Sequence, residues 1–283
     1  MGCQEHVHKL GYRTNQDIQK SHLNLERLTG HPNKQTKTLK IMADEKKKRK
    51  LFSADDFDKQ ISVGEQLVFD KQDLNTVKID LIWAGTDLDV CAFMLDDSNM
   101  MNEREDLVYF KSQRRWVPNL PFDDPNFDPL QGRVSKTWKE EGYKNPLKWM
   151  EATLPLSGDD AVIGSWDDMA DDDDTECGET MHVRLDEVDV SQHSSIVFAA
   201  TVAKDRIQAG ESFEDAHDPI VRIYDAEKDE LIAEYKLADK FPGKDVVCFG
   251  RMVYDENEML WNFEPMADAY NGGMEFLATE VYG

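Results

Sequence analysis

Cysteine is scarce in this sequence, and the cysteines that occur are not spaced as pairs. Four are present among 283 residues: Cys3, Cys91, Cys177 and Cys248. No two of them have the Cys-x-x-Cys spacing of a zinc knuckle or a dithiol redox site. Cys91 and Cys248 lie in apolar runs, where a free cysteine behaves as a small hydrophobic residue. Zinc binding through thiolates and thiol redox catalysis are therefore not indicated.

Long hydrophobic runs are also missing, and basic residues are outnumbered. No stretch of about 18 apolar residues occurs, so no membrane-spanning helix is predicted, and the polar residues after Met1 differ from a secretory signal. Lysine and arginine number 33 against 57 acidic residues, which gives a formal net charge of −24. Nucleic-acid binding depends on basic residues that neutralise phosphate, so no nucleic-acid partner is expected. We expect a cytoplasmic protein whose partners are cations, basic proteins or other subunits.

From about residue 67 onward, the sequence contains a series of short strand patterns. Three segments alternate apolar and polar residues, as a strand with one buried face does: 77–81, 181–185 and 221–224. Continuous apolar runs at 196–202 and 246–249 indicate central strands buried on both faces. Polar segments at 225–230 and 255–258 separate strands as hairpin turns do. These patterns predict a mainly all-β fold, a β-sandwich of two antiparallel sheets with short helices in its loops.

The chain divides into an N-terminal extension and one long domain. Residues 1–60 are polar and lack apolar periodicity, so we expect a disordered or loosely ordered segment. Met42 is one candidate for the natural start of the chain, and an expressed polar tail is the alternative. Residues 61–283 carry the strand patterns and form the predicted sandwich domain.

Residues 111–155 interrupt the strand patterns and are predicted to be an insertion. The segment contains six prolines and three tryptophans. Prolines break regular structure, yet the aromatic content is too high for a solvated linker. We therefore expect an ordered insertion packed beside the acidic site described next, with a short helix over residues 134–141. Insertions that border a site commonly shape it or recruit a partner.

Two acidic segments far apart in the sequence are the candidate functional site. The first contains Asp87 and Asp89, and the second runs from Gly158 through Asp171 to Glu179. Because carboxylates repel one another, a rigid cluster of them requires a cation, and Ca²⁺ takes roughly six to eight oxygen ligands. In an extended segment Asp87 and Asp89 lie on one side, while the residue between them faces the core. Strand-end acids that face water, or a solvated acidic loop, are the alternatives.

The motifs around these acids resemble those of the TerD-type tellurium-resistance and stress proteins, a family of small bacterial calcium-binding β-sandwich domains. The first family motif, Asp-x-Asp-Leu-Asp followed by a small residue and Ala-Phe, is similar to residues 85–93, with Gly85 in place of the leading Asp. The second motif, Gly-Asp-Asn before a glycine-rich Asp-Asp-Glu run and a strand, is similar to residues 158–185. Further family-like positions follow in order to about residue 275.

The resemblance implies a cofactor, a function and a set of ligands. It implies a sandwich domain that binds Ca²⁺ and acts, without enzymatic activity, as a sensor or scaffold, with a protein partner in a stress-response complex. It implies these metal ligands: Asp87, Asp89, Asp159, Asp160, Asp173, Asp174 and Glu176. Asp171 and Asp172 are undecided, and the oligomeric state is open.

Two other functions are compatible with the residues. The same carboxylates suit a metal-dependent hydrolase or phosphoryl-transfer enzyme, although no Lys or Arg clamp or glycine-rich phosphate loop lies near them in the sequence. Alternatively, the chain is an assembly subunit that binds a partner protein through the insertion.

Overall fold

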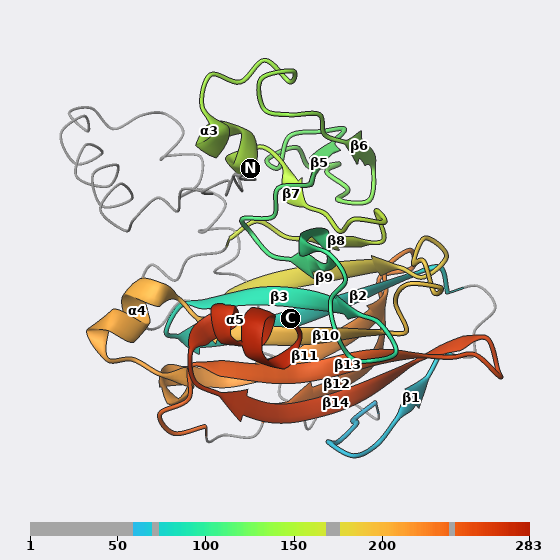
Figure 1. Cartoon of the computed structure of the whole chain (residues 1–283), viewed down its shortest axis with the longest axis vertical. Coiled ribbons are helices and arrows are strands. Elements are labelled where there is room, and N and C mark those ends of the chain that lie inside the picture. Colours follow the sequence, from blue (N-terminus) through green and yellow to red (C-terminus); the bar gives the residue numbers. More distant parts are fainter. Residues whose placement is uncertain (1–58, 70–73, 168–175, 238–240) are drawn as a thin grey trace, which may run out of the picture. The chain divides into compact units, whose positions relative to one another are not determined.

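The computed structural model describes residues 59–69, 74–167, 176–237 and 241–283. All of them belong to one compact unit that spans residues 49–283. Strands dominate this unit and its helices are short, as Figure 1 shows. The predicted all-β fold is therefore confirmed. The predicted extension over residues 1–60 lies outside the described residues except for Lys59 and Gln60.

Two large antiparallel sheets form the sandwich. Sheet A has the strand order β12-β11-β2-β9-β8, with bounds Glu230–Lys236, Ala216–Asp225, Thr76–Gly85, Cys177–Arg184 and Val162–Gly164. Sheet B has the order β1-β14-β13-β10-β3-β4, with bounds Leu67–Val68, Leu260–Tyr270, Val246–Asp255, Ser195–Val202, Leu88–Leu95 and Leu107–Val108. The segments predicted as strands lie in β2, β9, β10, β11 and β13. The predicted turns join β11 to β12 and β13 to β14.

The described residues contain six short helices: η2 (Arg104–Asp106), α3 (Pro146–Glu151), α4 (Lys204–Ala209), η3 (Phe213–Asp215), α5 (Gly273–Phe276) and η4 (Leu277–Val281). Within the described part of the chain, none of them has the length and apolar character needed to cross a membrane.

The main core lies between the two sheets. Along β2, Val77, Ile79 and Leu81 face inward, and along β3, Leu88 and Val90 do the same. All five are at most 2% exposed. Because side chains on a strand alternate between its faces, the residues between them face the other way. This alternation fixes the direction of each acidic side chain on these strands.

The outer face of sheet B is covered by the C-terminal helices. Cys91 and Phe93 of β3 and Cys248 of β13 pack there against Leu277 and Tyr282. Both cysteines are fully buried, and burial raises the pKa of the Cys248 thiol to about 11. They serve as small core residues, as the sequence predicts. A thiol that stays protonated is also a poor nucleophile.

The residues predicted as an insertion form a small third sheet, sheet C. Its order is β6-β5-β7, with bounds Gly132–Val134, Arg115–Pro118 and Leu154–Pro155. Trp116, Leu154 and Leu156 pack together with Ile163 of β8 in sheet A. The insertion is therefore attached to the β8 side of the sandwich, where Figure 1 shows β7 next to β8.

The helix predicted over residues 134–141 is wrong. Residues 138–142 form a turn instead, in which Gly142 has φ +83°. The helix of the insertion, α3, begins later in the chain. The side chain of Asn145 accepts a backbone N–H of its first turn, and proline occupies its first position. These two start signals, rather than the spacing of apolar residues, decide where the helix forms.

The edge strands β4 and β8 are shorter than the strands that they cover. β4 pairs with β3 at Ala92 and Phe93, and β8 pairs with β9 from Met181 to Val183. The first residues of β3 and of β9 therefore extend past their edge strands. These two strand ends belong to opposite sheets and come together at one edge of the sandwich.

Candidate metal site

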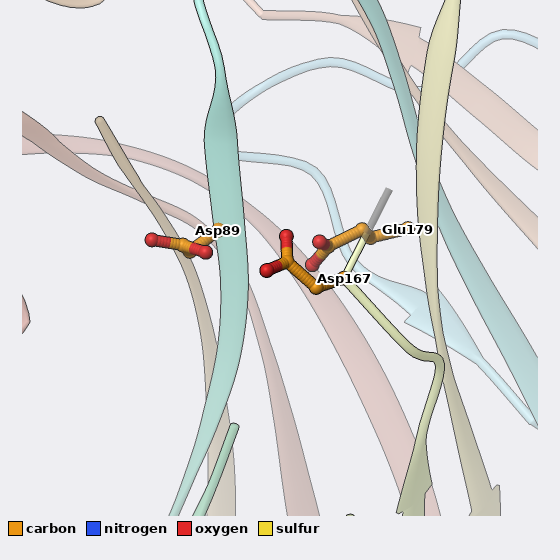
Figure 2. Close-up of side chains that lie close together, drawn as sticks. All are labelled: Asp89, Asp167 and Glu179. Carbon is orange, nitrogen blue, oxygen red and sulfur yellow. The ribbon is translucent and has the colours of Figure 1, made fainter. Parts of the chain in front are cut away.

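Three carboxylates meet where β3 and β9 extend past the edge strands. Oxygen atoms of Asp89, Asp167 and Glu179 all lie within 4.8 Å of one another. Asp89 comes from β3 in sheet B, Glu179 from β9 in sheet A, and Asp167 from the segment after β8. Figure 2 shows the side chain of Asp167 between the other two. The cluster therefore connects the two sheets at one edge.

Glu179 points into the sandwich because of its position along β9. Cys177, Met181 and Val183 face the core, so the alternation of the strand turns Glu179 inward as well. Its side-chain oxygen accepts the backbone N–H of Val90 at 2.7 Å. This donor lies on the part of β3 that extends past β4, where an edge strand would otherwise satisfy it. Glu179 thus has a fixed position at the sheet edge.

Asp89 and Asp167 reach the cluster from either side of that edge. Leu88 and Val90 are buried in the core on either side of Asp89, and they hold its backbone in place. Ser165 is still paired with β9, since its N–H donates to the carbonyl of Thr180 at 2.8 Å. Asp167 follows two residues later, after the chain has left the strand.

The carboxyl group of Asp89 has an unusual charge state. Burial, followed by the charges of Asp167 and Asp87, raises its pKa to about 7, while the charge of Lys111 opposes the shift. At neutral pH the carboxyl group is therefore close to half protonated, and a bound cation would replace its proton. Lys111 belongs to the insertion, so the fold brings a basic residue toward acids that have none near them in the sequence.

The three carboxylates fit a hard metal cation. Oxygen is the ligand atom that Ca²⁺ and Mg²⁺ prefer, whereas zinc sites are built mainly from nitrogen and sulfur. Ligand oxygens on opposite sides of a Ca²⁺ ion lie about 5 Å apart. Oxygens that lie within 4.8 Å of one another can therefore contact one ion. Asp89, Asp167 and Glu179 are the residues that would hold it.

Asp87, a second predicted ligand, lies near the cluster but is not one of its three members. Its charge raises the pKa of Asp89, and its backbone carbonyl accepts the N–H of Ala203 at 2.9 Å. Its binding to a metal stays a prediction.

Gly85 explains why the leading acid of the family motif is missing. Its φ is +91°, and a Cβ atom at this position would lie 2.2 Å from the carbonyl oxygen of Asp215. An aspartate cannot fit in this conformation. The backbone conformation at the end of β2 therefore excludes a carboxylate ligand at this position.

Asp159, another predicted ligand, is paired with a buried histidine. The Nε2 atom of His193 lies 3.0 Å from Asp106, and its Nδ1 atom lies 3.5 Å from Asp159. Burial alone would lower the pKa of His193, but the contacts with both carboxylates raise it to about 9. Asp159 also accepts the hydroxyl of Ser157 and the backbone N–H of Ala161. We call Asp106, His193 and Asp159 the histidine triad, and it connects the short helix η2 with two loops.

Asp160 is paired with an arginine of the insertion. One side-chain oxygen accepts from Nε of Arg114 at 2.9 Å and from Nη2 at 2.6 Å. Its φ is +68°, a conformation that asparagine and aspartate tolerate better than most residues. This explains why aspartate can stand where the family motif has asparagine. Metal binding by Asp159 and Asp160 stays a prediction, since both carboxylates contact protein cations.

The last three predicted ligands belong to the acidic run before β9. Asp173 and Asp174 lie outside the described residues. Glu176 is described and precedes β9, but it is not one of the three clustered carboxylates. Of all the predicted ligands that the structure describes, Asp89 alone is in the cluster. Asp167 and Glu179 are not among the predicted ligands, although both lie within the acidic second segment.

A comparison with protein families identifies the domain. Residues 155–281 match the model of the TerD domain. The chain carries a TerD domain. This is the domain of the tellurium-resistance and stress family that the motifs resemble. No curated protein matches the chain.

The TerD match begins where the predicted insertion ends, so β2, β3 and Asp89 lie outside it. In the structure, however, β2 lies between β11 and β9, and β3 lies next to β10. The strands of the matched segment therefore need the two earlier strands to complete both sheets. The two-sheet unit of the structure is therefore larger than the segment that matches the TerD model.

Proposed function

We propose that this chain is a non-enzymatic calcium-binding module of the stress-response type, in which Asp89, Asp167 and Glu179 hold one Ca²⁺ ion. The observation that carries the proposal is the meeting of three carboxylates from separate elements within 4.8 Å. After burial, the charge of Asp167 is the largest contribution to the raised pKa of Asp89. A divalent cation would offset the repulsion between these carboxylates.

The kind of site favours Ca²⁺ over Mg²⁺. The ligands come from two sheets and a loop, so their spacing is not constrained to one regular geometry. Mg²⁺ requires near-octahedral coordination and gives up water reluctantly, whereas Ca²⁺ accepts irregular sets of carboxylates, carbonyls and waters. The backbone around β3 and water would supply the remaining ligands.

A bound ion would connect the sheets of the sandwich. Asp89 belongs to sheet B and Glu179 to sheet A, so one ion between them acts as a clamp at the edge that β4 and β8 leave open. Such a clamp suits a sensor or a scaffold, because the edge is tightened when Ca²⁺ is present. A protein partner that binds this edge of the sandwich would then meet a different surface with and without Ca²⁺.

An enzymatic function is the alternative, and Lys111 is the observation in its favour. Its charge acts on Asp89, and phosphoryl-transfer sites combine a metal with basic residues. Such sites hold the transferred phosphate with several groups in a cradle, which a single lysine does not provide. We therefore favour a binding module, and a phosphatase and glycosidase screen of the purified protein with Ca²⁺ or Mg²⁺ tests the alternative.

The test is a calorimetric titration with Ca²⁺ and Mg²⁺ of the full chain and of two variants that lose one charge each. Asp89→Asn removes a clustered carboxylate and should weaken Ca²⁺ binding by at least about tenfold, since opposite charges at contact interact by about 4 kcal/mol near a protein surface. Asp186→Asn removes an exposed carboxylate after β9 and should change the affinity less than about twofold at the same ionic strength.

Equal small losses in both variants would show that the acids attract cations as a diffuse charge cloud. In that case no formed site exists at Asp89, and the proposal fails.

A further inference from the structure

An aromatic cluster lies directly beside the proposed metal ligand Asp167. The ring centroid of Trp166, the preceding residue, is 4.6 Å from that of Phe122 and 6.0 Å from that of Phe127. The two phenylalanine rings contact each other edge to face at 5.3 Å. Each ring contacts the other two, and we call the three residues the aromatic triad.

The two phenylalanines belong to a well-bonded loop of the insertion. This loop connects β5 to β6 and is closed by a hydrogen bond from the N–H of Asn119 to the carbonyl of Gln131 at 2.8 Å. Within it, the N–H of Phe127 donates to the carbonyl of Asp124 at 3.0 Å, and the side chain of Asp124 accepts the N–H of Asn126 at 2.9 Å. The loop therefore presents both rings in a defined position.

The insertion itself is attached to the sandwich on the same side. Trp116, Leu154 and Leu156 pack against Ile163 of β8, and the guanidinium group of Arg184 lies over the ring of Trp116 at 5.0 Å. The loop that carries the phenylalanines is thus anchored to β8 and β9, the strands that lead to Asp167 and carry Glu179.

The chain between β8 and Asp167 is held from both sides. Ser165 is bonded to β9, because its N–H donates to Thr180 and its hydroxyl accepts from Thr180. Trp166 is the next residue and is held by the two phenylalanines. Asp167 follows it directly, and Figure 2 shows the resulting position of its carboxylate between Asp89 and Glu179.

We propose that Phe122 and Phe127, acting through Trp166, position the carboxylate of Asp167, so that the insertion sets the ion affinity of the site. The inference rests on the proposed function. The phenylalanines are positioning residues that do not touch the ion themselves. Without their packing, the segment at Asp167 must be ordered when the ion binds, and this ordering lowers the affinity.

The first measurement is the Ca²⁺ affinity of full-length variants by calorimetry. Phe122→Ala should weaken binding by about three- to tenfold, the loss expected when a ligand segment is no longer preorganised. Phe122→Leu keeps apolar bulk, should lose less, and replaces the alanine variant if that variant does not fold. Trp166→Phe keeps an aromatic ring and should stay within about twofold of the wild-type affinity.

The second measurement is spectroscopic. Tb³⁺ takes the place of Ca²⁺ on oxygen ligands and emits light when a nearby tryptophan transfers its excitation energy. Tb³⁺ should give sensitised emission with the wild-type chain, and Ca²⁺ should compete it away. Trp166→Phe should lose most of the emission while it retains Ca²⁺ affinity, a result that places the bound ion beside Trp166 and Asp167.

The matched control is the aromatic pair of Tyr254 and Trp261, whose ring centroids are 5.3 Å apart. Asp89 and Val246 both pair with Thr201, so Tyr254 lies eight residues along β13 from the level of the site, or about 25 Å. Tyr254→Ala should lower stability and leave the Ca²⁺ affinity unchanged.

The outcomes separate the two proposals. If the wild-type chain binds neither Ca²⁺ nor Tb³⁺, the proposed function fails and the inference fails with it. If it binds both ions, and the Phe122 variants retain affinity as Tyr254→Ala does, the inference is wrong while the proposed function stands.

Discussion

The histidine triad predicts a loss of stability at alkaline pH that one substitution should abolish. The side chain of His193 is 7% exposed and contacts the carboxylate of Asp106 in η2 and that of Asp159 in the turn before β8. Asp106 in turn accepts the backbone N–H groups of Asn102 and Glu103. His193→Gln removes the titrating charge but leaves a side chain of similar size and hydrogen-bonding ability.

The magnitude follows from the two pKa values of His193. The group titrates at 6.5 in its ordinary state and at about 9 in the folded chain, a difference worth about 3 kcal/mol. Because the folded pKa is raised, this stabilisation is complete below pH 6.5 and is lost as the pH rises through about 9. At acid pH the triad weakens for a different reason. The pKa values of Asp106 and Asp159 are held below 3.8, so their contribution is lost when they are protonated.

The assay is urea denaturation of the wild-type and His193→Gln chains at a series of pH values from 6.5 to 9 with a chelator present. The wild-type free energy of unfolding should fall relative to that of the variant by about 3 kcal/mol across the range. Cysteine and tyrosine titration cancels in the difference. His217→Gln, at an exposed position of β11, should keep the wild-type slope. Parallel curves for the wild type and His193→Gln would refute the charged triad.

Three further predictions concern the ion, one glycine and one buried arginine. Ca²⁺ should raise the thermal midpoint more than Mg²⁺, because a ligand at a hundredfold excess over its Kd stabilises the folded state by about 2.7 kcal/mol; equal shifts would contradict the calcium site. Gly85→Ala should cost more than about 2 kcal/mol in urea denaturation because of its close approach to the backbone, whereas Gly142→Ala, with open space around it, should cost about 1 kcal/mol. Arg115→Met should cost about 3 kcal/mol, because it leaves the buried carbonyl and hydroxyl of Thr153 without the donor that now bonds them; an unchanged denaturation midpoint would show that water replaces the guanidinium.

The large strands were predictable because their side-chain patterns record which faces are buried. All residues of β10 are buried, and its sequence is apolar except for Ser195 and Thr201. β2 faces the core on one side, and its sequence alternates. Strands of two or three residues, such as β4, β7 and β8, are too short to show either period. Such short strands form only because they pair with neighbours that are distant in the sequence. For this reason sheet C, which contains β6 and β7, could not be predicted from the sequence.

Of the three carboxylates in the cluster, the sequence predicted Asp89 as a ligand. Asp89 stands in a motif directly before an apolar strand. Glu179 was missed because the predicted strand begins at Met181, whereas β9 begins at Cys177. Glu179 itself is a polar residue at an inward position of β9, so the apolar alternation becomes visible only from Met181 onward. Asp167 was missed because its place depends on the packing of the preceding tryptophan against the insertion, a contact between distant segments.

The strand order of sheet A has a consequence for how the domain folds during synthesis. β2 leaves the ribosome before its neighbour β11, whose pairing of Ala216 with Gly85 joins residues more than a hundred positions apart. Pairings of such long range form slowly, because loop closure must come first. Until residue 216 has emerged, β2 presents a bare strand edge and the side chain of Trp83, which makes the unfinished domain a target for chaperones and for aggregation.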